Sequence, residues 1–284
     1  MPNRRPVAES LQEYARGVGG GLLFSLPLLY TAEVWATGAS ASPLRLLAVV
    51  VGTFGLLVAY NQTAGIRVDH TFGEVLVESV EEMGLGLTVA AGLLALFGRF
   101  PDDPFSPEAL GLLTVAGMIA AVGVSVGTAQ LGQSPGDSGN DSDDSPEGEA
   151  DAQPQSAVVE LAVALCGAVL VAANVAPTEE VFRLGTEMPP GALAGVVGLS
   201  LAAGGGILYA SAFRGSEGLR GQAFGPVAGT LVSYAVALGA SAALLWAVGF
   251  GDPTPLTTSV GPLVVLAFPS MIGASAGRLL LSPS

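Results

Sequence analysis

Long apolar stretches alternate with short polar ones along the whole chain. Eight of the apolar stretches are about 20 residues long, which is enough for a helix to cross the hydrocarbon core of a membrane. We place them at 17–37, 44–61, 82–98, 109–130, 157–177, 190–212, 224–249 and 260–280. The sequence therefore predicts an all-α polytopic membrane protein of about eight transmembrane helices, with the lipid bilayer as its surroundings.

One polar stretch, 132–156, differs from the other connections. It is rich in Ser, Gly, Pro and Asp, and holds seven acidic residues and no large apolar residue. Such a composition cannot bury a core, and it predicts a disordered acidic linker. The linker divides the chain into four parts: a cytoplasmic N-terminal segment 1–16, a first helical unit 17–131, the linker 132–156 and a second helical unit 157–284.

The two helical units resemble each other in sequence. The segment 28–35 is similar to 175–182, and further matches continue at an offset that stays between 147 and 151 residues. The matched positions include Thr31 and Thr178, Glu33 and Glu180, Gly38 and Gly185, and Gly98 and Gly249. We predict an internal duplication into two four-helix repeats. Because each repeat has an even number of spans, the repeats are parallel and related by an axis along the membrane normal.

The charged residues indicate which partners the protein can bind and how it is oriented in the membrane. Acidic residues number 24 against 10 basic residues, all of them arginine, so the net charge is −14. This excludes a nucleic-acid partner, which needs a basic surface. An acidic chain without lysine also leads to the hypothesis of a halophilic source, because dense surface charge keeps proteins soluble in high salt. The arginines favour cytoplasmic N- and C-termini in the cell (plasma) membrane.

The repeated glutamates are the main candidate site. Glu33 and Glu180 lie near the ends of apolar segments, where a carboxylate is costly unless it is paired or faces water. Together on a shared axis they would form an acidic pair suited to a cation or a shared proton. The predicted path residues are Thr31, Glu33, Asn174, Thr178, Glu179 and Glu180.

Simpler interpretations stay open for these acids. Glu33 would also fit a carboxylate that reaches the outer interface beside Trp35. Pro177 would also fit a helix boundary, with Glu179 and Glu180 at the favourable N-terminus of the next helix. We interpret Glu160 as an interfacial charge at the cytoplasmic end.

Four further acids precede the third span. They are Glu74, Glu78, Glu81 and Glu82. Their helical spacing predicts an amphipathic surface helix with a hydrated acidic face.

Catalytic chemistry has little support in the sequence. The chain has one histidine, His70, and one cysteine, Cys166, so we predict no cofactor, no metal site and no enzyme activity. Glu179, Glu180 and Arg183 are similar to the motif of the CAAX-type intramembrane proteases. That family has three residues between glutamates and arginine where this chain has two, and it uses membrane-embedded histidines that are missing here. We therefore disfavour this activity.

Three segments together resemble a known family. They are 19–35, 174–180 with the run Asn-Val-Ala-Pro-Thr-Glu-Glu, and 267–278. They are similar to a prokaryotic integral membrane protein family known only as a domain of unknown function, so the resemblance implies an architecture and no activity. From the acids we predict a channel or transporter for a cation or small solute; the alternative is a non-transporting membrane scaffold or sensor whose linker binds a partner.

Overall fold

The computed structural model describes residues 7–29, 31–64, 71–132, 157–176, 178–214, 224–249 and 256–280. Within these ranges the chain forms ten helices and no strand, which confirms the predicted all-α class. The helices are α1 (Val7–Leu29), α2 (Ala32–Ser40), α3 (Pro43–Ala64), α4 (Phe72–Leu96), α5 (Pro107–Gly132), α6 (Ala157–Ala173), α7 (Glu179–Glu187), α8 (Pro190–Arg214), α9 (Pro226–Ala247) and α10 (Leu256–Leu280).

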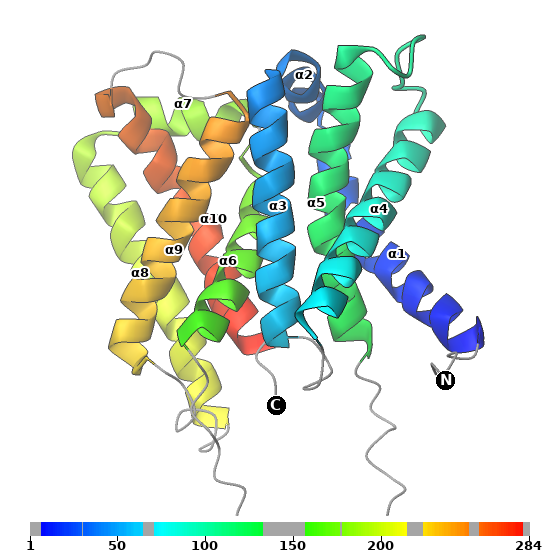
Figure 1. Ribbon diagram of the computed structural model, residues 1–284. Coiled ribbons are helices and arrows are strands. Elements are labelled where there is room, and N and C mark those ends of the chain that lie inside the picture. The colour runs from blue at the N-terminus through cyan, green and yellow to red at the C-terminus, as the bar shows by residue number, and fades with distance from the viewer. Residues whose placement is uncertain are drawn as a thin grey trace, which may run out of the picture.

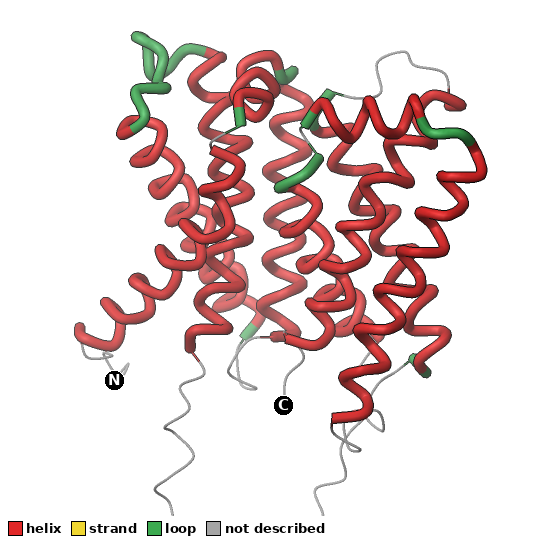
Figure 2. Tube along the Cα trace, turned by 180° about the vertical axis from the view of Figure 1, so that it is seen from behind, coloured by secondary structure: helices red, strands yellow, loops and turns green. Residues whose placement is uncertain are grey.

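The long helices lie side by side and cross the molecule from one end to the other (Figure 1). The short helices α2 and α7 both lie at one end, which we call the short-helix end. At the opposite end α1 begins, α5 ends, α6 begins and α10 ends. Seen from behind, most of the described loops lie at the short-helix end (Figure 2).

In the part of the chain that the structure describes, six helices are long and apolar enough to cross a membrane. The segments are Pro43–Gln62, Phe72–Leu96, Pro107–Thr128, Pro190–Tyr209, Val227–Ala247 and Ser259–Arg278. Helix α6 is also apolar but has only 17 residues. These segments support a multi-pass protein of the lipid bilayer.

Two expected elements differ from the structure. The predicted span 17–37 is two helices: α1 begins earlier, at Val7, and α2 begins after Thr31, whose backbone is extended (φ −98°, ψ 126°). Pro27 lies in the last turn of α1, where its ring and missing N–H group disfavour continuation of the helix. The predicted surface helix and the span 82–98 are one continuous helix, α4. Of the predicted linker, 133–156 lies outside the described residues.

Local sequence signals set many of the helix ends. Proline is the first residue of α3, α5, α8 and α9, a position where its missing N–H group costs nothing. Helices α4 and α9 each end just before a glycine with positive φ, Gly98 (63°) and Gly249 (93°). Glycine adopts this conformation without the strain that a side chain brings.

The two halves pack in the same order. In the first half α5 contacts α1, α2, α3 and α4; in the second, α10 contacts α6, α7, α8 and α9. Two further pairs also match, because α1 contacts α4 as α6 contacts α9, and α3 contacts α4 as α8 contacts α9. Helices α5 and α10 are therefore the central helices of their halves.

Glycines allow close approach at matched places. A Cβ atom on Gly111 of α5 would overlap the carbonyl oxygen of Gly38 on α2, and one on Gly261 of α10 would overlap that of Gly185 on α7. Small residues at such crossings let helix backbones meet within a membrane.

The halves meet chiefly where α3 lies against α6, with smaller contacts from α5 to α6 and from α3 to α9. The buried residues of this interface include Leu57, Tyr60, Val163, Cys166 and Leu170. Helices α1 and α8 lie at opposite edges of the molecule (Figure 1).

Candidate functional site

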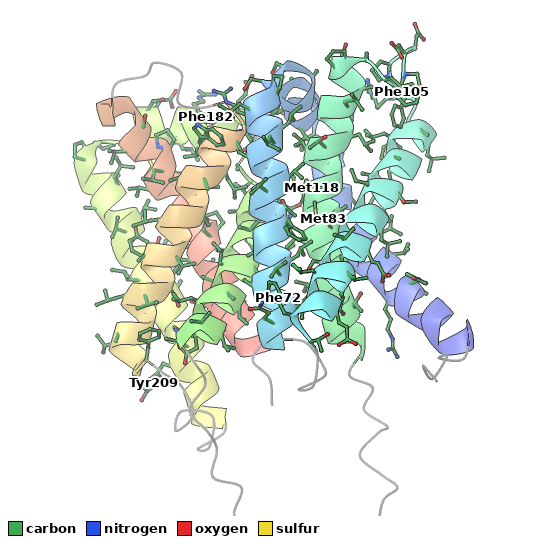
Figure 3. All side chains as sticks on the ribbon, in the orientation of Figure 1. Phe72, Met83, Phe105, Met118, Phe182 and Tyr209 are labelled. Carbon is green, nitrogen blue, oxygen red and sulfur yellow. The ribbon has the colours of Figure 1, made fainter. Side chains whose placement is uncertain are left out.

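The predicted site residues lie at the short-helix end. Glu33 is in the first turn of α2 and is partly exposed, whereas Glu179 and Glu180 are in the first turn of α7 and are exposed. Figure 3 labels Phe182 of α7 at this end of the molecule. Carboxylates in the first turn of a helix interact favourably with the positive end of its dipole.

Glu33, Glu179 and Glu180 are not on the buried faces of the two short helices. Helix α2 buries Val34 and Gly38, and α7 buries the matching Val181 and Gly185. Helix α2 packs on α5, whereas α7 packs on α10. Whether Glu33 and Glu180 share one aqueous site stays a prediction.

Two polar residues near these acids, Asn174 and Thr178, donate hydrogen bonds to backbone carbonyl groups three or four residues earlier in the chain. The Asn174 side chain donates from Nδ2 to the carbonyl oxygen of Leu170 (2.7 Å), and the Thr178 hydroxyl donates to that of Val175 (2.9 Å). Oδ1 of Asn174 is buried and has no hydrogen-bond partner among the described residues. Thr31 and Thr178 are the residues immediately before α2 and α7.

A small cavity lies between the halves. Its volume is about 90 Å³, and its walls come from α2, α3, α5, α6 and the C-terminal end of α9. The lining is apolar except for Thr37 and Thr53; Met118, labelled in Figure 3, is one of the apolar lining residues. None of the six predicted path residues lines this cavity.

A buried carboxylate, Glu82, lies inside the first half. Its residue is only 7% exposed. Asn61 of α3 donates from Nδ2 to Glu82 Oε2 (2.8 Å) and to the Ser79 hydroxyl (3.2 Å). Ser125 of α5 donates to Asn61 Oδ1 (3.1 Å). Side chains from three helices thus form a connected set of hydrogen bonds, which we call the Glu82 cluster (Asn61, Ser79, Glu82 and Ser125).

The position of Glu82 corrects the prediction of a fully hydrated acidic face. Helix α4 buries Val75, Ser79, Glu82 and Gly86, which recur at spacings of three and four residues. Glu74 and Glu81 are exposed, as predicted. The neighbouring Met83, labelled in Figure 3, lies between the ends of the molecule marked by Phe72 and Phe105.

The spacing of small and apolar residues was the signal that sequence reasoning missed. Glu82 stands in register with Val75, Ser79 and Gly86, so the same pattern that predicts a buried helix face includes it.

A buried ion pair lies inside the second half. Arg278 of α10 donates from Nη2 to Glu160 Oε2 of α6, and both residues are 3% exposed. Nη1 of Arg278 donates to the Gly229 carbonyl (3.1 Å) and to the Ser233 hydroxyl (3.2 Å), both on α9. Glu160 is therefore not the interfacial charge that we predicted. An arginine that lies 118 residues away in sequence compensates its burial.

A family model matches nearly the whole chain. Residues 13–281 match the family described as "Putative integral membrane protein (DUF2391)". The chain belongs to this family. Membership confirms the resemblance drawn from the sequence, and the family has no assigned function. Comparisons with curated proteins and with solved structures give no significant match.

Two buried charged sites, the Glu82 cluster and the ion pair of Glu160 and Arg278, therefore lie within the apolar packing of the bundle. Among the described residues, no group of three or more His, Cys, Asp or Glu side chains is arranged to hold a metal ion. Carboxylate, amide and hydroxyl oxygens, as in the Glu82 cluster, are ligand types that a monovalent cation or a proton can use.

Proposed function

We propose that the protein moves a small monovalent cation, a proton or an alkali metal ion, across the membrane, and that Glu82 binds it. The burial of Glu82 and its hydrogen bond to Asn61, which in turn accepts one from Ser125, carry this proposal. A carboxylate at membrane depth costs roughly 2.5 kcal/mol or more, so helices rarely keep one without a use.

The Glu82 cluster has the chemistry to hold its carboxyl group in two states. The ionised form accepts a hydrogen bond from Asn61. Serine hydroxyls rotate and both donate and accept, so Ser79 and Ser125 can adjust when a proton or an alkali ion binds. Oxygen ligands are also the ones that alkali ions find in selective membrane sites.

The cavity between the halves does not resemble a pocket for an organic solute. Pockets for small molecules usually measure about 300–1,000 Å³. The cavity between the halves measures about 90 Å³ and is mostly apolar, which is small for an organic substrate.

We further propose that α1 and α6 also cross the membrane, which brings the number of spans to eight in two parallel repeats. The matched helix contacts, the paired glycine crossings and the two positive-φ glycines support the duplication. The arrangement of the helices supports parallel repeats, because α1 and α6 both begin at the end opposite the short helices (Figure 1). The arginine distribution supports cytoplasmic termini, with the short-helix end outside.

In this proposal the predicted path residues form the outer entrance. Glu33, Glu179 and Glu180, with Thr31, Asn174 and Thr178, lie around the N-terminal ends of α2 and α7. Exposed carboxylates raise the local concentration of cations at a membrane surface. Their role is attraction, and the binding step belongs to Glu82.

A flux assay tests the proposal. Purified protein in liposomes is given gradients of Na⁺, of K⁺ and of protons, the last followed by a trapped pH-sensitive dye. We expect flux of at least one of these cations, and a loss of about tenfold or more in Glu82→Gln, because a contact between opposite charges near a protein surface is worth roughly 4 kcal/mol.

Glu81→Gln is the matched control, since Glu81 is the adjacent, exposed acid. It should keep the wild-type flux. Equal leakage from wild-type and protein-free liposomes would contradict transport and favour the scaffold or sensor alternative.

A further inference from the structure

The two halves meet through different faces. Helix α3 of the first half packs on α6 of the second. In the matched order of helices α3 corresponds to α8 and α6 corresponds to α1, so a symmetric interface would also bring α8 against α1. Helices α1 and α8 instead lie at opposite edges of the molecule (Figure 1). The interface between the halves is therefore heterologous, and it leaves one copy of each of its two faces at an outer edge.

Glycine crossings fix the correspondence between α1 and α6. A Cβ atom on Gly20 of α1 would overlap the carbonyl oxygen of Gly123 on α5. In the second half, a Cβ atom on Gly167 of α6 would overlap the carbonyl oxygen of Gly273 on α10. Helix α1 therefore matches α6 at an offset of 147 residues.

The face of α6 that meets α3 is repeated on α1. Leu170 of α6 belongs to the apolar cluster between the halves and is 5% exposed, whereas its counterpart Leu23 of α1 is 68% exposed. Cys166, one turn earlier on the same face, is also buried, and its counterpart Gly19 is partly exposed. One edge of the molecule thus carries an exposed copy of an internal contact face.

The correspondence between α3 and α8 follows from their buried positions. Leu57 and Asn61 of α3 are buried, and so are Gly204 and Leu208 of α8, which lie at the same offset of 147 residues. These positions are one helical turn apart and mark the face that each helix turns toward the rest of its own half.

The face of α3 that meets α6 is repeated on α8. Leu56 and Tyr60 are buried in the cluster between the halves, whereas their counterparts Ala203 and Ile207 are partly exposed. Ala203 is smaller than Leu56, and small residues let helices approach closely within a membrane. The opposite edge of the molecule thus carries the complementary face.

We propose that α8 of one chain packs on α1 of a second copy of the same chain, as α3 packs on α6 within each chain. A second copy fits because its α1 carries the face that α6 offers to α3, and because copies in one membrane share one orientation, as parallel repeats do. Repetition of such a heterologous contact gives a ring of chains when the rotation closes. This inference rests on the duplication proposed above, and it does not depend on cation transport.

Cysteine crosslinking in native membranes tests the contact. Two differently tagged chains are co-expressed, one with Leu23→Cys on α1 and the other with Ala203→Cys on α8, and the membranes are oxidised. We expect disulfide-linked pairs that carry both tags, and loss of these pairs when either cysteine is omitted. Chains with only the native Cys166 are the control, since this thiol is 1% exposed. Pairs that carry one tag twice in place of mixed pairs, or no pairs above the control, would overturn the proposal.

Subunit counting provides a second arm. One fluorophore per chain is bleached stepwise in liposomes, and we expect more than one step per particle for wild type. Ala203→Trp should reduce this to one step, because a large ring holds the next chain away. Val51→Trp is the matched control, since Val51 is 60% exposed on α3, between the two edges, and it should keep the wild-type number. Single steps in wild type, or unchanged steps in folded Ala203→Trp, would overturn the proposal.

Neither arm uses cation flux, so the two claims fail separately. Cation flux through a wild-type protein that bleaches in single steps would leave the proposed function in place and overturn only the assembly. Mixed-tag pairs from a protein without flux would support the assembly and contradict transport.

Discussion

Glu81 and Glu82 are adjacent in sequence and have opposite surroundings. A helix turns by about 100° per residue, so Glu81 is exposed while Glu82 is buried and accepts a hydrogen bond from Asn61 of α3. The second half has a similar contrast, because Glu160 is buried against Arg278 while Glu179 and Glu180 are exposed. The acidic residues of this chain therefore fall into a buried group and an exposed group, and their positions along the predicted spans do not reveal which group each belongs to.

Asn61 provides a residue-scale prediction. Asn61→Ala removes the hydrogen bond to Glu82 Oε2 and leaves buried polar atoms without that partner, so the free energy of unfolding should fall by about 1–3 kcal/mol. Thermal unfolding in detergent micelles measures the effect. Gln62→Ala changes the exposed neighbour and should leave the unfolding midpoint unchanged. Equal midpoints for the two variants would contradict a structural role for the Asn61 hydrogen bonds.

The sequence identified some of these residues and missed others for physical reasons. Glu33 and Glu180 stand out because each lies in an apolar run. Glu82 is hidden among four acids at a span boundary, so its burial depends on neighbours from other helices. The partner of Glu160 is 118 residues distant, and no local pattern reports such a pair.

Helix α5 and helix α10 organise their halves through small residues. Their glycines meet Gly38 of α2 and Gly185 of α7 at contacts where a methyl group does not fit. The long helices α3, α5, α8, α9 and α10 could be predicted from their apolar length, and an initial proline marks the start of the first four. The separate helix α2 could not, because the apolar run continues through Thr31 while the chain changes direction there.

The glycine crossings give a prediction at the scale of the element. Gly111→Ala forces α2 away from α5 and should destabilise the protein by about 1–3 kcal/mol. Gly92→Ala is the matched control, because Gly92 lies within α4 with open space around it. Alanine favours a helix over glycine by about 1 kcal/mol, so this variant should be as stable as wild type or slightly more stable. Thermal unfolding that ranks Gly111→Ala at or above Gly92→Ala would contradict the close crossing.

At the scale of the whole molecule, two similarly packed halves carry different charges. The halves share their helix order and their internal contacts and meet mainly through α3 and α6. Glu82 belongs to the first half, and the ion pair of Glu160 and Arg278 belongs to the second. A repeated pattern in the sequence predicted the duplication, whereas this difference in charge became clear only from which side chains are buried together.

The most direct test of the account is whether the Glu82 carboxyl group itself takes up a cation. Infrared difference spectra of the reconstituted protein, recorded as choline is replaced by Na⁺ or K⁺ and as the buffer is acidified, report changes in carboxyl groups. We predict a carboxyl band that is present in wild type and in Glu81→Gln and absent in Glu82→Gln. Spectra of Glu82→Gln identical to those of wild type under every exchange would contradict a cation site at Glu82.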